Sequence, residues 1–237
     1  MTNLNTALVT GSGRGIGKET AILLSKKGLN VIICSRTQKE IESAVKEIKS
    51  LGNDQIIGRK CDVSISAEVN TLVNEALDIY GRIDVLINNA GITYVKKLID
   101  TTEKQWDQTL DINLKGSFLL CKAIVPHMIE SNCGVIINVS SGAGKVGFED
   151  ISAYCASKFG MIGLTESLAR EVANYNIRVM TICPGEVATK MQEDVDSRYY
   201  ELNKHKMLHP RTVAEKIADM VFSDKEYQSG IAVDLPN

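Results

Sequence analysis

The chain has 237 residues, of which 44% are hydrophobic and 24% are charged, and its formal net charge at pH 7 is −2. This composition is typical of a globular protein. The chain holds no block of like charge that would follow a phosphate backbone, and no apolar run approaches the roughly 18 residues of a membrane span. We therefore expect no nucleic-acid partner and no membrane partner, and the N-terminus, which lacks the pattern of a leader, predicts a cytoplasmic location.

Short β-branched runs alternate along the chain with longer amphipathic segments, which is typical of βαβ units. The expected strands are 5–10, 30–35, 55–60, 83–88, 134–139, 177–183 and, with a weaker pattern, 230–235. The expected helices are 16–27, 38–51, 66–80, 106–130, 153–175 and 211–223. No linker or repeat interrupts this order, so residues 1–237 are predicted to form a single α/β domain, a doubly wound parallel sheet with helices on both faces.

The six cysteines do not indicate a metal site or a disulfide framework. They lie far apart, with no CxxC pair and no histidine at ligand spacing. We expect them to be small buried apolar residues.

The first strand is followed by a glycine-rich loop, "TGSGRGIG" at 10–17. Gly11, Gly15 and Gly17 follow a G-x-x-x-G-x-G spacing, which differs from the strict G-x-G-x-x-G fingerprint. A loop of this kind between a strand and a helix lets the backbone approach a pyrophosphate. Two alternatives stay open: the glycines only make a tight turn, or the site is of the methyltransferase type.

The end of the second strand bears on the choice of nucleotide. Ser35 stands where an acidic residue would accept the 2′-hydroxyl of NAD, Arg36 follows it, and Arg14 lies in the glycine loop. Two guanidinium groups suit a 2′-phosphate, and a missing carboxylate removes a repulsion, so NADP(H) is favoured over NAD(H). The alternative is that Arg36 is a solvated charge at a strand end.

Tyr154 and Lys158 lie four residues apart in a predicted helix and so share one of its faces. A nearby cation lowers the pKa of a phenol, which would suit Tyr154 to acid–base work near neutral pH. Ser141, at the end of the fifth strand, would bond a substrate carbonyl beside Tyr154. The alternative for Tyr154 and Lys158 is a pair on the surface of a helix. Asn113 is a polar residue within a long helical segment and would need hydrogen-bond partners if buried; the alternative for it is a structural cap or kink.

Taken together, these motifs resemble those of the short-chain dehydrogenase/reductase family. The matching residues are "TGSGRGIG" at 10–17, "CDV" at 61–63, "NNAG" at 88–91, Asn113, Ser141, "YCASK" at 154–158 and "PGEVAT" at 184–189. They occur in the family's order from residue 5 to about 190.

The resemblance implies a Rossmann fold and a role for each matching residue. Tyr154 is the expected general acid, Ser141 polarises the carbonyl, Lys158 lowers the phenol pKa and binds the nicotinamide ribose, and Asn113 anchors a water in a proton relay. The expected NADP(H) contacts are Gly11, Ser12, Arg14, Gly15, Ile16, Gly17, Ser35, Arg36, Asp62, Val63, Asn89, Ala90, Gly91, Tyr154, Lys158, Pro184, Val187 and Thr189.

Two departures from the family pattern concern the C-terminal part of the chain. The segment that closes over substrate is short, at about 190–208, and the ending "GIAVDLPN" is atypical. Members of the family commonly assemble through the helices that correspond to 106–130 and 153–175, so a homo-oligomer, a tetramer or dimer, is expected; ordinary packing of these helices on the sheet is the alternative.

The resemblance predicts an enzyme that reduces a ketone or aldehyde with NADPH, and within the family the chain is most similar to 3-oxoacyl thioester reductases. The first alternative is a dehydrogenase of small alcohols, sugars or hydroxy acids. The second is a non-catalytic subunit that senses NADP(H).

Overall fold

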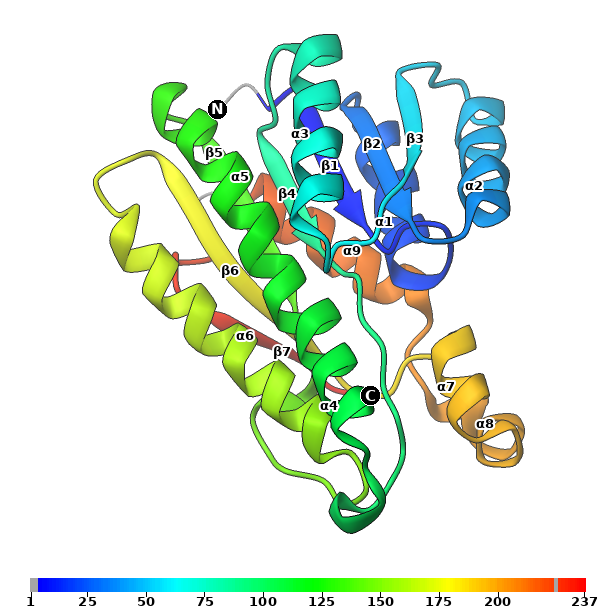
Figure 1. Ribbon diagram of the computed structural model, residues 1–237. Helices are drawn as coiled ribbons and strands as arrows, with labels where there is room; N and C mark the ends of the chain where they lie inside the picture. The colour runs from blue at the N-terminus through cyan, green and yellow to red at the C-terminus, as the bar shows by residue number, and fades with distance from the viewer. Residues whose placement is uncertain (1–3, 224–225) are drawn as a thin grey trace.

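The computed structural model describes residues 4–223 and 226–237, and a parallel sheet of seven strands forms its centre (Figure 1). The strand order is β3-β2-β1-β4-β5-β6-β7, and every neighbouring pair is parallel. The strands are β1 Thr6–Thr10, β2 Asn30–Ser35, β3 Ile56–Lys60, β4 Val85–Asn88, β5 Gly134–Val139, β6 Ile177–Pro184 and β7 Ala232–Leu235. This order confirms the predicted doubly wound sheet.

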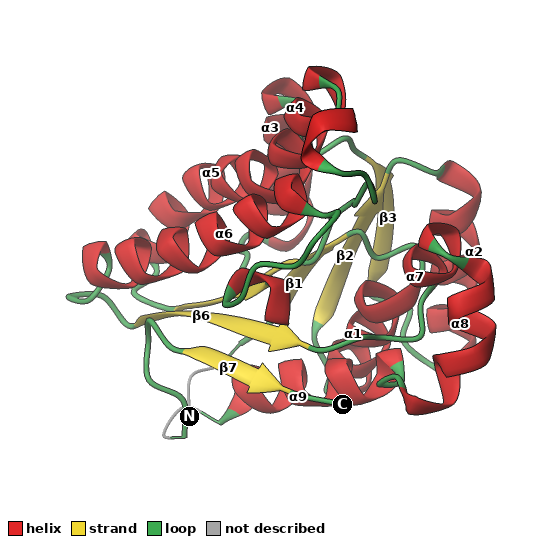
Figure 2. Ribbon diagram, turned by 90° about the horizontal axis from the view of Figure 1, so that it is seen from below, coloured by secondary structure: helices red, strands yellow, loops and turns green. Residues whose placement is uncertain are grey.

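Helices cover both faces of the sheet, as Figure 2 shows from one edge. The side chains of β1 alternate between the faces: Ala7 and Val9 pack with α1, α2 and α9, whereas Leu8 packs with α3, α5 and α6. The helices are α1 Gly15–Lys26, α2 Gln38–Ser50, α3 Ser66–Tyr80, α4 Glu103–Leu110, α5 Gly116–Glu130, α6 Ser152–Glu171, α7 Lys190–Val195, α8 Ser197–Asn203 and α9 Pro210–Phe222.

The predicted helix at 106–130 is two helices joined by one wide turn. Thr102 caps α4 and forms a reciprocal capping box with Gln105, so α4 begins three residues earlier than the periodicity indicated. The π-helical turn Asp111–Lys115 then separates α4 from α5. The predicted helix at 153–175 ends as α6 at Glu171.

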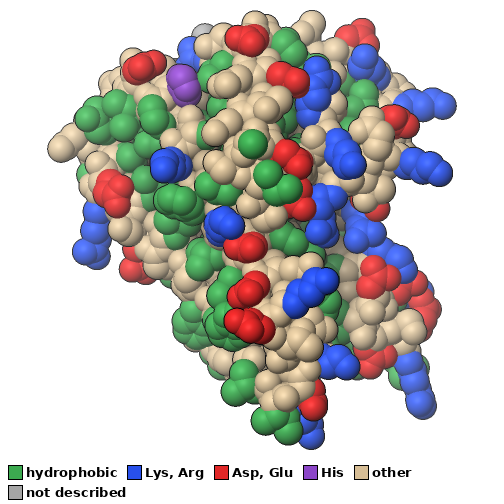
Figure 3. Space-filling view, viewed as in Figure 1, with side chains coloured by type: hydrophobic (Ala, Val, Ile, Leu, Met, Phe, Trp, Pro, Cys, Tyr) green, Lys and Arg blue, Asp and Glu red, His purple; other side chains and the backbone are tan. Residues whose placement is uncertain are grey.

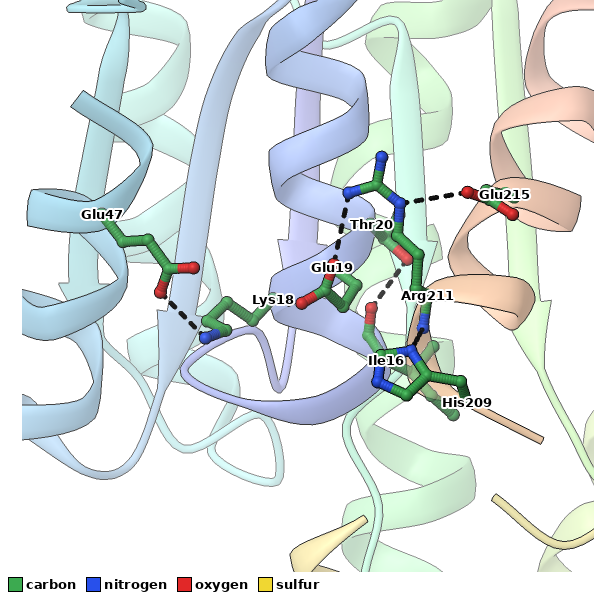
Figure 4. Close-up of polar contacts among 8 residues, drawn as sticks. All are labelled: Ile16, Lys18, Glu19, Thr20, Glu47, His209, Arg211 and Glu215. Carbon is green, nitrogen blue, oxygen red and sulfur yellow. Dashed lines mark hydrogen bonds and ion pairs between the residues drawn. The ribbon is translucent and has the colours of Figure 1, made fainter. Parts of the chain in front are cut away.

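Ion pairs link α1 to its two neighbours. Lys18 bonds Glu47 of α2 at 2.8 Å, and Arg211 of α9 bonds Glu19 at 3.4 Å (Figure 4). Because α1 follows directly from the glycine loop, these contacts lie close to that loop.

The strand order reverses between β1 and β4, and a buried carboxylate joins the starts of these two strands. Asp84 has no solvent-exposed surface, and its Oδ2 accepts the backbone N–H groups of Asn5 at 2.7 Å and Thr6 at 3.1 Å. Its other oxygen accepts from Arg82. The carboxylate therefore satisfies two backbone donors that the strand ladder leaves free.

All six cysteines are buried and unpaired, as predicted. Across residues 4–223 and 226–237, no helix is both long enough and apolar enough to cross a membrane.

We expect Asp84→Ala to lower the free energy of unfolding by about 3 kcal/mol, because it leaves the N–H groups of Asn5 and Thr6, at the start of β1, without an acceptor. Chemical denaturation followed by circular dichroism measures this change. Asp78→Ala, at an exposed position of α3, is the control and should change the same quantity by less than about 0.5 kcal/mol. If Asp84→Ala and Asp78→Ala lowered the free energy of unfolding equally, the structural role of the Asp84 carboxylate would be contradicted.

Candidate active site

A cleft of about 520 Å³ runs along the carboxyl edge of the sheet. In an open α/β sheet, the point where the strand order reverses opens a crevice at this edge. Seventeen of the residues predicted from the sequence line the cleft: Gly11, Arg14, Gly15, Ile16, Ser35, Arg36, Asp62, Val63, Asn89, Ala90, Gly91, Ser141, Tyr154, Lys158, Pro184, Val187 and Thr189.

Ser12 and Gly17 lie behind the wall of the cleft and shape the glycine loop. Ser12 is fully buried; its Oγ donates to the carbonyl of Val9 at 2.6 Å and accepts the N–H of Cys34 at 3.0 Å. A Cβ atom placed on Gly17 would lie 2.5 Å from Nδ2 of Asn89. Neither residue lines the cleft, so both determine the shape of the loop from its buried side.

Thr10 and Asn89 clamp the two strands at the switch point. Oγ1 of Thr10 accepts the N–H of Asn89 at 3.0 Å and that of Ala90 at 3.1 Å, while Nδ2 of Asn89 donates to the carbonyls of Thr10 and Gly11. Thr10 opens the motif quoted at 10–17, but sequence reasoning gave it no role, because a threonine at a strand end carries no signal of its own.

The N-terminus of α1 opens toward the cleft. Gly11, with φ of +60°, turns the chain from β1 into the loop, and Arg14, the N-cap residue, offers no side-chain acceptor to the first turn of α1. The free N–H groups of this turn are therefore left for an anion. This arrangement fits the pyrophosphate of a dinucleotide.

Tyr154 and Lys158 share one face of α6 at the far end of the cleft from the end of β2. Nζ of Lys158 lies 5.4 Å from the centre of the Tyr154 ring and donates to the carbonyl of Val139, the last residue of β5, at 2.7 Å. Ser140 also donates to the carbonyl of Lys158 at 3.0 Å. The end of β5 thus holds the ammonium group directly.

Asn113 does not line the cleft; it ties the loop after β4 to α6. Its Oδ1 accepts the N–H of Ile92 at 2.8 Å, and its Nδ2 donates to the carbonyl of Ile92 at 2.9 Å and to Oγ of Ser157 at 3.0 Å. Ser157 in turn donates to the carbonyl of Tyr154. The side-chain amide is fully used in positioning its neighbours, and the water relay stays a prediction.

Burial shifts the pKa values of both site residues. Burial lowers the pKa of Lys158 to about 8, while it raises the pKa of Tyr154, an effect that a hydrogen bond with Ser141 partly offsets. The net shift of the phenol pKa is upward because burial outweighs the hydrogen bond with Ser141, and the lowering of this pKa by Lys158 stays a prediction.

The segment at 190–208 follows the end of β6, and its first helix, α7, lines the cleft. It consists of α7, α8 and a 3₁₀ turn at Lys204–Lys206. The carboxylate of Glu186, which lines the cleft, accepts from the hydroxyl of Tyr199 in α8 at 3.0 Å and from Gln192 in α7 at 3.5 Å. Sequence reasoning missed Glu186, which lies inside a motif matched for its other residues.

The cleft as a whole fits a nicotinamide dinucleotide. It offers Arg36 after β2, Arg14 and free N–H groups at the start of α1, and a phenol beside an ammonium group at its other end. Within the described residues, no three His, Cys, Asp or Glu side chains are placed to hold a metal ion.

Comparison with known sequences gives consistent matches. The family model described as short chain dehydrogenase matches residues 5–199. A 3-oxoacyl-[acyl-carrier-protein] reductase of Thermotoga maritima is 34% identical over 233 residues, 96% of this chain and 94% of that protein. A protein of the same name from Staphylococcus aureus is 39% identical over 196 residues, 82% of this chain and 79% of that protein.

Two solved structures share the fold over almost the whole length. Levodione reductase superposes with a TM-score of 0.91 at 28% identity and covers 98% of this chain and 95% of its own. A variant of actinorhodin polyketide ketoreductase, determined with NADPH, has a TM-score of 0.92 at 31% identity and covers 100% of this chain and 97% of its own.

The buried ammonium group of Lys158 predicts a stability that depends on pH. Below pH 8 this lysine is protonated in both the folded and the unfolded chain, and its burial destabilises the fold. Between about 8 and the ordinary value of 10.5 the unfolded chain binds more protons, so the contribution of this group to stability rises with pH.

We therefore expect Lys158→Met to unfold with a free energy higher than wild type at pH 7, by on the order of 3 kcal/mol, because the pKa falls from 10.5 to about 8 at about 1.4 kcal/mol per pK unit. The difference should shrink as the pH is raised toward 10. Urea denaturation at pH 7, 8, 9 and 10 measures it. A variant less stable than wild type at pH 7, or a difference that does not change with pH, would contradict this prediction.

Proposed function

Because this chain belongs to the short-chain dehydrogenase family, we propose that its cleft binds NADP(H) and that it reduces the ketone group of a 3-oxoacyl thioester. The protein is an oxidoreductase that acts on CH–OH groups. The observation that carries the proposal is the convergence of Ser141, Tyr154 and Lys158 at one end of a cleft whose other end holds Arg14 and Arg36.

Each of the three residues has a distinct task in this proposal. Ser141 holds and polarises the carbonyl oxygen, and Tyr154 delivers its phenolic proton to that oxygen as the alcohol forms. Lys158, held by the carbonyl of Val139, binds the nicotinamide ribose and favours the phenolate that is left. Bound NADPH supplies the hydride.

The cofactor is held in our proposal by the loops at the strand ends. The N–H groups at the start of α1 bind the pyrophosphate, and Arg36, exposed at the end of β2, binds the 2′-phosphate. Asn89 to Gly91 line the middle of the cleft, and Pro184, Val187 and Thr189 flank the nicotinamide. The ketoreductase with a similar fold was determined with NADPH, which supports the choice of nucleotide.

The proposed substrate class follows from the relatives' names, since two of them are 3-oxoacyl-[acyl-carrier-protein] reductases. The alternative within enzymes is a dehydrogenase of small alcohols, sugars or hydroxy acids. A non-catalytic NADP(H)-sensing subunit would have no use for Ser141, Tyr154 and Lys158 together, and nothing favours that reading.

We also propose that the segment at 190–208 acts as a short substrate lid on the single domain formed by residues 1–237. Exposed aromatic side chains support assembly into a tetramer or dimer: Phe118 on α5 and Phe159 on α6 are each 46% exposed. The face drawn in Figure 3 shows hydrophobic side chains between mixed charges. The cytoplasmic location stays a prediction.

The proposed activity predicts a loss in Tyr154→Phe. Oxidation of NADPH at 340 nm, measured with acetoacetyl thioesters, diketones, aldehydes and ketoses, should be fastest with the thioesters. Loss of the phenolic proton should lower kcat/KM by at least about 100-fold. Tyr175→Phe, which changes an exposed tyrosine that does not line the cleft, is the control and should retain activity within about twofold. Turnover of thioesters no faster than the uncatalysed rate would rule out the substrate class.

The proposed cofactor predicts a selective effect at the end of β2. Arg36→Ala should raise the Kd for NADPH by about tenfold, because it removes a charge-assisted bond to the 2′-phosphate, and should change the Kd for NADH by less than about twofold. Adding Ser35→Asp should shift preference further toward NADH. Fluorescence titration of each nucleotide measures both constants. Equal effects on NADPH and NADH would show that Arg36 does not contact the phosphate.

A further inference from the structure

A carboxylate that the sequence did not indicate lies at the end of β2. Glu40, in the first turn of α2, lines the cleft together with Ser35 and Arg36. Its Oε1 lies 3.3 Å from Nη1 of Arg14, the residue that precedes α1. The side chains of Arg14 and Glu40 are 53% and 31% exposed, so the pair is within reach of a ligand in the cleft.

The backbone of Gly13 locates this carboxylate relative to Ser35. A Cβ atom placed on Gly13 would lie 3.2 Å from Oε2 of Glu40 and 3.2 Å from Oγ of Ser35. Both oxygens therefore flank one point beside the glycine loop. Ser35 stands where an acidic residue reads the ribose in NAD-dependent proteins, and Glu40 brings an acid to the same place from the next helix.

This placement changes the charge balance inferred from the sequence. The absence of an acid at position 35 suggested two free arginines and no negative charge near the 2′ position. In the structure Arg14 is paired with Glu40, whereas Arg36 has no ion-pair partner among residues 4–223 and 226–237. A 2′-phosphate would meet one unpaired guanidinium group, one paired guanidinium group and one carboxylate.

We propose that Glu40 is a specificity-determining residue for the cofactor, because its carboxylate competes with the 2′-phosphate of NADP(H) for Arg14. This inference rests on the proposed function. Glu40 weakens NADP(H) through repulsion of the phosphate and through its bond to Arg14, whereas the neutral 2′-hydroxyl of NAD(H) meets neither effect. Glu40 thereby reduces the preference for NADP(H) over NAD(H), so that NAD(H) can also serve as cofactor.

A matched control lies on the same helix. Glu47 is two turns further along α2 and pairs with Lys18 at 2.8 Å, as Figure 4 shows, but it does not line the cleft. Glu40→Gln and Glu47→Gln each remove one negative charge and one ion pair between α2 and the start of α1. They differ in whether the lost charge faces the cleft.

The experiment is a titration of NADPH and NADH into wild type and both variants, followed by fluorescence and repeated at 20 and 300 mM salt. Thermal melts check that each variant folds. For a partly exposed pair we expect Glu40→Gln to lower the Kd for NADPH by about three- to tenfold and to change the Kd for NADH by less than about twofold. Glu47→Gln should change both by less than about twofold, and the effect of Glu40→Gln should shrink at high salt.

A second test uses Arg14→Met in both backgrounds. If the ion pair with Glu40 keeps Arg14 from the 2′-phosphate, the loss of this arginine should weaken NADPH binding more in the Glu40→Gln protein than in wild type. Equal losses in the two backgrounds would overturn the proposal.

The outcomes separate this inference from the proposed function. If wild-type protein binds NADPH and the Kd for NADPH of Glu40→Gln equals that of wild type or of Glu47→Gln, the role of Glu40 is overturned and the proposed function stays intact. Wild-type protein that binds neither nucleotide would overturn both.

Discussion

The hydrogen bonds between Thr10 and Asn89 are the contacts on which the site depends most. They join the carboxyl ends of β1 and β4, the two strands between which the sheet reverses its order. The chain leaves these strands toward opposite sides, so a crevice opens between the loops that follow. Because the threonine hydroxyl and the asparagine amide satisfy the backbone groups there, both loops end in fixed positions, and the cleft keeps its shape.

The same edge explains why a charged lysine is tolerated in the interior. Lys158 is almost fully buried, which disfavours its charged form, and a single carbonyl at the end of β5 accepts its ammonium group. Burial also raises the pKa of the neighbouring phenol above an ordinary value of 10 that already keeps Tyr154 protonated near neutral pH. A residue that donates a proton during reduction has to be protonated when the substrate binds, and this environment meets that condition. The fold thus gives up stability where the proposed chemistry needs a buried cation beside the acid.

Helix packing decides how the nucleotide end of the cleft is charged. Buried side chains of α1 and α2 share one core cluster, and the first turn of α2 lies beside the glycine loop. Glu40 reaches the loop only because the two helices lie side by side. A charge balance counted from the residues that follow the strands is therefore incomplete, since it leaves out the side chains that helices supply.

The sequence by itself determined the order of the elements, the parallel sheet and most of the cleft. The seven strands followed from their β-branched runs, and Arg36 was found because it follows a strand whose carboxyl end lies at that edge. Tyr154 and Lys158 were found from their four-residue spacing on one helix face. The tertiary structure alone decided what depends on packing across elements. The hydrogen bonds of Asn113 to Ile92 and Ser157, the burial of Ser12, the raised pKa of Tyr154 and the approach of Glu40 to Arg14 all depend on segments distant in the chain, where local pattern and spacing carry no information about distance.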